Sequence, residues 1–145
     1  MLFREAFEGR EEGKNSTWFV EGREAILPTL DEIDAMAASH SPGSGLPSIA
    51  AHAYHLRYIL QWVNVPAGGE KPTGDWNSTW EKETVSDAEW DALRAEIKER
   101  YGRAVKWLAE NEDWSYEDAH PNFLAPLPHV AYHLGAIRVL LKLVS

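Results

Sequence analysis

Residues 86–108 read SDAEWDALRAEIKERYGRAVKWL, and this stretch carries the clearest helix pattern in the chain. Ser86 and Glu89 match the capping box, in which a hydroxyl and a carboxylate three residues apart satisfy free amides at a helix N-terminus. Apolar residues then recur every three or four positions, which places them on one face of a helix. They are Trp90, Leu93, Ile97, Tyr101, Val105 and Leu108. The stretch therefore predicts an amphipathic helix that packs against other elements.

Three further segments show helical periodicity on either side of this stretch. The four predicted helices cover about residues 16–39, 48–64, 86–108 and 126–145. A kink is expected near Pro28, because proline removes a helical hydrogen bond. Residues 66–85 have no periodicity and join the second and third helices. Long loops of this kind are often functional, but the simpler interpretation is a structural crossover that tryptophans hold over one end of the bundle. Together these features predict an all-α single domain over residues 1–145: a four-helix bundle with a long crossover loop between helices 2 and 3.

The composition limits the classes of function. The formal net charge is −9, and the 14 basic residues are scattered among 23 acidic ones, which argues against nucleic acid and against anionic lipid as partners. There is no cysteine, so any metal must be held by nitrogen and oxygen ligands. No stretch approaches the roughly 18 apolar residues of a membrane span, and the N-terminus lacks the apolar run of a signal peptide. We therefore expect a cytoplasmic protein that does not associate with a membrane.

Histidines on two of the predicted helices carry the most specific chemistry. His129 and His133 are four residues apart, or about 400° of helical rotation, so both imidazoles leave the same face one turn apart. That spacing suits two nitrogen ligands on one metal ion. Burying several imidazoles costs desolvation unless each nitrogen has a partner, and a shared cation would supply one.

A third imidazole could come from either of two histidines on the second predicted helix. His52 lies at the centre of the apolar seam of this helix, whereas His55 lies about 60° away from it on a helical wheel. Periodicity alone therefore favours His52 as the third ligand.

Three parts of the sequence resemble DinB-like proteins. Ser48-Ile49 followed by His55-Leu56 is similar to the second helix of that family, and residues 87–93, DAEWDAL, are similar to its third. Residues 129–137, HVAYHLGAI, resemble its closing His-x-x-x-His-x-Gly-Gln-Ile motif. The resemblance extends over about residues 16–144, with order and spacing kept.

The resemblance implies an up-up-down-down-like four-helix bundle that binds one divalent metal ion through three histidines. Carried over by position, these are His55, His129 and His133, which leaves His52 as an alternative ligand or a neighbouring pocket residue. The chain departs from the family motif at Ala136, which stands where the motif has glutamine. Any hydrogen bond from that glutamine to the metal surroundings is therefore lost, and such bonds tune metal affinity.

Three neutral imidazoles leave an open position on a zinc ion for water or substrate, and nickel, iron or manganese accept the same ligands. The family includes thiol transferases that use low-molecular-weight bacterial thiols. The resemblance thus implies a metal-dependent transferase or hydrolase that acts on a small electrophile, with such a thiol as possible co-substrate. We also expect a homodimer, which the family suggests and which is the commonest oligomer. The Trp76 to Trp80 part of the long loop could line the site.

The sequence assigns no catalytic acid or base. Tyr54, Tyr132, Asp75 and Asn122 have suitable side chains, but nothing in the sequence places them at the site. The alternative function is a non-catalytic helical module whose histidines hold a structural ion or only pack together. A fourth protein ligand would favour this alternative, because closed structural zinc sites have four.

Overall fold

The computed structural model describes residues 2–11, 13, 20, 23–43, 45–112 and 124–144, and every regular element within these ranges is helical. The long helices are α4 (Ile49–Val63), α5 (Asp87–Glu110) and α7 (Pro126–Val144). The short ones are α1 (Leu2–Glu8), α2 (Ile26–Asp31), α3 (Ala35–Ala38) and the 3-10 turn η1 (Asn77–Trp80). The all-α prediction is confirmed for these parts of the chain.

Helix α5 begins where its sequence predicts. The Ser86 side chain accepts a hydrogen bond from the Glu89 amide, and the Glu89 carboxylate accepts one from the Ser86 amide at 2.8 Å. The apolar face of the helix points into the core. The indole nitrogen of Trp90 on this face donates to the carbonyl oxygen of Ile33 at 2.8 Å. The buried residues of the helix are Trp90, Leu93, Ile97, Tyr101 and Ala104. This face holds α5 against α4 and the segment between α2 and α3.

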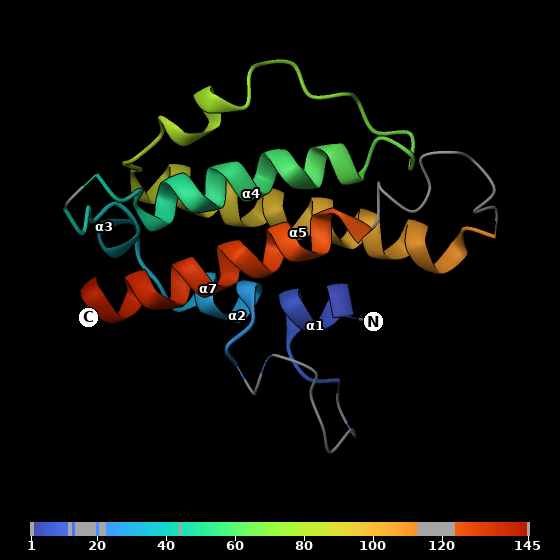
Figure 1. Ribbon diagram of the computed structural model, residues 1–145, viewed down its shortest axis with the longest axis horizontal. Helices are drawn as coiled ribbons and strands as arrows, with labels where there is room; N and C mark the ends of the chain where they lie inside the picture. Colours follow the sequence, from blue (N-terminus) through green and yellow to red (C-terminus); the bar gives the residue numbers. More distant parts are fainter. Residues whose placement is uncertain are drawn as a thin grey trace.

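Helices α4 and α5 lie side by side and run in the same direction (Figure 1). At the start of α4, the Ser48 hydroxyl donates to the carbonyl oxygen of Glu83, which lies just before α5. At the end of α4, the Asn64 side chain donates to the carbonyl oxygen of Arg100, far along α5. Both contacts require the connection between the helices to return along the length of α4, and η1 lies in this connection.

The N-terminal region differs from its prediction. The described part of the expected helix over residues 16–39 forms two short helices, α2 and α3, with a break between them. Asp34 ends the continuity, because its backbone is extended (ψ 171°) and its side chain caps α3 by accepting from the Ala37 amide at 2.7 Å. Pro28 lies inside α2 rather than at a kink in a longer helix. Residues 16–19, 21 and 22, in the first part of the prediction, lie outside the described residues.

Helix α1 has no counterpart among the predicted helices. Its Phe7 is fully buried and stacks on Tyr101 of α5, with ring centroids 4.5 Å apart. The helix also contacts α2 and α7, so it packs against the helical core on the side of these two helices.

Among the described residues, α7 alone is long and apolar enough to cross a membrane by length and composition. This is weak evidence for a span, because core helices of soluble proteins meet the same criterion. Here the inward face of α7 contributes Val130, Leu134, Ile137 and Leu140 to the core, together with His133. The outer face of α7 also carries large exposed apolar side chains, Tyr132, Val139 and Leu143, so packing accounts for only part of its apolar composition. The inward face brings His133 to α4.

Candidate metal centre

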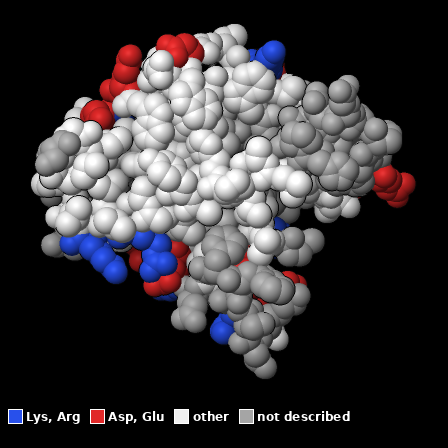
Figure 2. All heavy atoms as spheres, in the orientation of Figure 1, with Lys and Arg blue, Asp and Glu red and all other residues white. Residues whose placement is uncertain are grey.

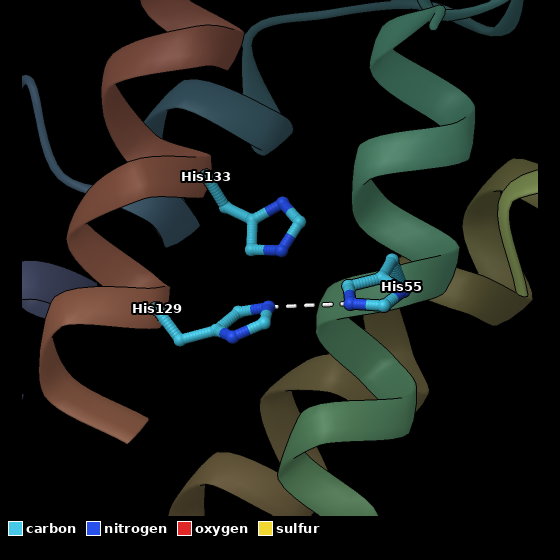
Figure 3. A group of neighbouring side chains, drawn as sticks. All are labelled: His55, His129 and His133. Atoms are coloured by element: carbon cyan, nitrogen blue, oxygen red, sulfur yellow. Dashed lines mark hydrogen bonds between the residues drawn. The ribbon is translucent and has the colours of Figure 1, made fainter. Parts of the chain in front are cut away.

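Helices α4 and α7 face each other and run in opposite directions, so their histidines meet in reverse order (Figure 3). Nε2 of His55 lies 3.2 Å from Nε2 of His129, and Nδ1 of His52 lies 3.0 Å from Nδ1 of His133. His55 and His133 are fully buried, His52 is 3 % exposed, and His129 is partly exposed. The antiparallel packing thus gathers imidazoles from both predicted helices in one place.

His55, His129 and His133 form a group that could hold a metal ion. One ring nitrogen from each lies within 4.8 Å of the others. Two imidazoles bound to one zinc at about 2.0–2.1 Å in tetrahedral geometry have nitrogens roughly 3.3–3.4 Å apart. The two Nε2 atoms of His55 and His129, at 3.2 Å, are already close to that spacing.

Thr79 of η1 determines which nitrogen of His55 carries the proton. Its hydroxyl donates its single hydrogen to the carbonyl oxygen of Trp76 at 2.7 Å, so it accepts from Nδ1 of His55 at 2.6 Å. With the proton on Nδ1, the lone pair of His55 is on Nε2, the atom that faces His129. A hydrogen bond of this kind on the outer nitrogen is typical of histidines that bind metals.

His133 has one satisfied and one unsatisfied nitrogen. Nδ1 is paired with His52, whereas Nε2 is buried and has no hydrogen-bond partner among the described residues. Leaving a buried polar atom without a partner costs free energy, so such atoms are rare and need an explanation. A cation bound between the three rings would accept this lone pair and remove the cost.

His52 lies outside the group formed by His55, His129 and His133. It lies on the far side of His133 and is bonded to it through Nδ1. The structure therefore brings together the three residues that the family resemblance implies, and it places His52 as their neighbour.

The connection between α4 and α5 supplies the aromatic walls of the cluster. Trp80 stacks on His55 with ring centroids 4.2 Å apart, and on His133 at 5.5 Å. Trp76 meets His55 and His129 edge-on, at 4.4 and 5.2 Å. These indoles cover one side of the histidine rings. Sequence reasoning had singled out Trp76 to Trp80, but it missed Thr79, because no sequence pattern marks a loop threonine as a partner for a distant histidine.

Burial keeps the imidazoles neutral at pH 7. Desolvation lowers the pKa of His52 and of His55 to about 4, and that of His133 to about 2. The pKa of His129 is lowered for the same reason. Repulsion between neighbouring imidazoles adds to the shift at His55 and His133. In a neutral imidazole one nitrogen carries a proton and the other keeps a lone pair, and a metal ion requires that lone pair.

The metal-free protein should become less stable as the pH falls below about 6.5. For a histidine with a lowered pKa, the unfolded chain binds more protons than the folded chain between the two pKa values. The free energy of unfolding is therefore highest above pH 6.5, the ordinary histidine pKa. It decreases as the pH falls toward about 4, the pKa of His52 and His55 in the folded chain. The slope is at most about 1.4 kcal/mol per pH unit for each such histidine.

Urea denaturation of chelator-treated protein from pH 7 to pH 5 measures this slope. His52→Gln removes one of the histidines whose pKa is lowered and should make the slope smaller. A free energy of unfolding that stays constant across this interval would contradict the prediction.

Comparisons with family models, with curated proteins and with solved structures gave no match for this chain. The function must therefore be inferred from the chemistry of the site itself.

Proposed function

We propose that this protein is a metal-dependent enzyme of the DinB-like type, in which His55, His129 and His133 bind one divalent ion. The observation that carries the proposal is the buried Nε2 of His133, which has no partner among the described residues and lies beside two neutral imidazoles. The proposed substrate is a small electrophile. The proposed co-substrate is a low-molecular-weight thiol, as the resemblance to DinB-like proteins implies, and the chain itself has no cysteine.

The fold that we propose is the four-helix bundle of that superfamily. In it α4, α5 and α7 form three members, and the short helices α1 and α2 together take the place of the fourth. The contacts of α1 with α7 and of α2 with α5 support this arrangement. The connection from α4 to α5 is then the crossover of the bundle, and it carries η1 to the histidines.

Each residue of the site has a defined task in this proposal. When bound, a divalent ion would supply Lewis acidity and lower the pKa of a coordinated water or thiol. Thr79 holds His55 with the lone pair of Nε2 directed toward His129, and His52 holds His133 through Nδ1. Trp76 and Trp80 limit the entry of water and so keep the site at low dielectric.

The number of ligands favours an enzyme over a structural module. Structural zinc sites are closed by four protein ligands, whereas catalytic sites have three and keep one position open. Only three histidines converge among the described residues. His52, the nearest further imidazole, uses Nδ1 to bond His133.

Metal titration of the chelator-treated protein tests the proposal. We expect one equivalent of Zn²⁺ or Ni²⁺ per chain by elemental analysis, and X-ray absorption should show three imidazoles plus at least one oxygen ligand. The loaded protein should then consume a thiol in the presence of a panel of small electrophiles, and the stripped protein should not. Absence of metal uptake would refute the proposal. A centre closed by four protein ligands without thiol consumption would favour the structural module.

A further inference from the structure

A cleft of about 470 Å³ lies next to the three-histidine group. Three aromatic side chains, Tyr58, Trp62 and Trp76, line it together with Pro126 and His129. His129 thus belongs both to the histidine group and to the cleft. We call this space the aromatic cleft.

The described residues that line the aromatic cleft carry no charged carboxylate, ammonium or guanidinium group. This is unusual for a chain with a formal net charge of −9. Figure 2 shows that Lys, Arg, Asp and Glu lie mainly toward the edges of the face that it displays. The Lys71 ammonium lies 5.3 Å from the centroid of the Trp62 ring but is not among the described residues that line the cleft. The lining therefore suits an uncharged apolar group better than a charged one, which would lose hydration there.

The aromatic side chains form a continuous series from the histidines outward. Trp76 meets both His55 and His129 edge-on, and it meets Tyr58 at 6.2 Å and 83°. Tyr58 in turn meets Trp62 at 6.4 Å and 78°. Edge-to-face arrangements are the geometry in which aromatic rings attract one another, so a flat ring from a ligand would find favourable partners here.

Two of these side chains are exposed to an extent that calls for an explanation. Trp76 is 46 % exposed and Trp62 is 39 % exposed, although both are large and apolar. Concave apolar surfaces with a few convergent polar groups are typical of small-molecule sites. In this cleft the convergent polar group is His129.

We propose that the aromatic cleft binds an uncharged aromatic part of the substrate and so directs its reactive group toward the ion at the three histidines. This inference rests on the proposed function, and it specifies the substrate class as small electrophiles that carry a flat apolar ring. The cleft determines selectivity, and the histidines provide the chemistry.

A pair of hydroxamates tests the cleft in the zinc-loaded protein. Acetohydroxamate chelates zinc with only a methyl group attached, whereas benzohydroxamate adds a phenyl ring to the same chelating group. We expect benzohydroxamate to bind about tenfold more tightly by calorimetry. Trp62→Ala should reduce this ratio about three- to tenfold, which is the usual contribution of an aromatic pair. Trp107→Ala, which alters a partly buried tryptophan on α5 outside the cleft, should leave the ratio unchanged.

A second arm uses the metal-free protein and 2-naphthol, an uncharged ring without a strong chelating group. The indole resonances of Trp62 and Trp76 should shift on addition of 2-naphthol, and that of Trp107 should not. If benzohydroxamate and acetohydroxamate bind with about equal affinity, or if 2-naphthol does not shift the resonances of Trp62 and Trp76, the proposed role of the cleft is wrong. Neither result would contradict the metal proposal. Absence of zinc uptake with the naphthol shifts present would refute the proposed function and support the cleft.

Discussion

His133→Ala should abolish stoichiometric metal binding while the helical content is retained. His133 contributes the buried Nε2 that has no partner among the described residues, and its removal leaves two ligands on the ion. Structural zinc sites gain about 10–16 kcal/mol from four ligands, so one ligand corresponds to roughly 2.5–4 kcal/mol, or about 70- to 900-fold in affinity. Competition with a chromophoric chelator measures the affinity, and far-ultraviolet circular dichroism measures the helical content.

His52→Ala is the matched control for this variant. His52 is also buried and is bonded to His133, but it lies outside the three-histidine group. We expect His52→Ala to keep one equivalent of metal with about tenfold weaker affinity, because His133 loses the partner that orients its ring. If His52→Ala loses the ion and His55→Ala keeps it, the ligand on α4 is His52 and the proposed site is misassigned.

The second large effect concerns stability. Trp90→Ala should lower the free energy of unfolding by about 3–5 kcal/mol, the usual range for truncating a buried tryptophan. Trp90 is 2 % exposed, and its indole nitrogen donates to the carbonyl oxygen of Ile33. The variant thus leaves a cavity and also a carbonyl group without its partner. Equilibrium urea denaturation, analysed as a two-state transition, measures the loss.

Trp90→Phe separates these two contributions. It keeps most of the apolar volume and removes only the hydrogen bond, so we expect a loss of about 1–2 kcal/mol. Trp62→Ala removes a partly exposed indole and should cost less than Trp90→Ala. A loss below about 1 kcal/mol for Trp90→Ala would show that α5 does not depend on this contact.

Local sequence patterns predicted the elements whose ends are set by local interactions. Helix α5 starts at its capping box, because Ser86 and Glu89 satisfy each other's amides without help from the rest of the chain. In the described part of residues 16–39, the predicted single helix is interrupted at Asp34, because its backbone is extended and its side chain caps α3. The contact of Trp90 with Ile33 also uses a carbonyl group just before that cap. Helix α1, from Leu2 to Glu8, is too short for a periodic pattern to identify.

The candidate site was predictable only in part. The pairing of His129 with His133 follows from helical spacing, which is a local property. The distinction between His52 and His55 depends on how α4 is rotated against α7. The helical wheel favoured His52, because it lies at the centre of the apolar seam, but both histidines are buried and His55 is the one grouped with His129 and His133. Thr79 and the tryptophans approach from the aperiodic connection, and their hydrogen bonds and ring contacts exist only in the folded chain.

The three histidines are on α4 and α7, whereas Thr79, Trp76 and Trp80 come from the connection that carries η1. In the proposed function, the two helices would hold the ion, whereas the connection would orient His55 through Thr79 and contribute Trp76 to a cleft that is otherwise lined by residues of α4 and the start of α7. A substitution in this one segment would therefore affect both the coordination of His55 and the fit of a ligand ring.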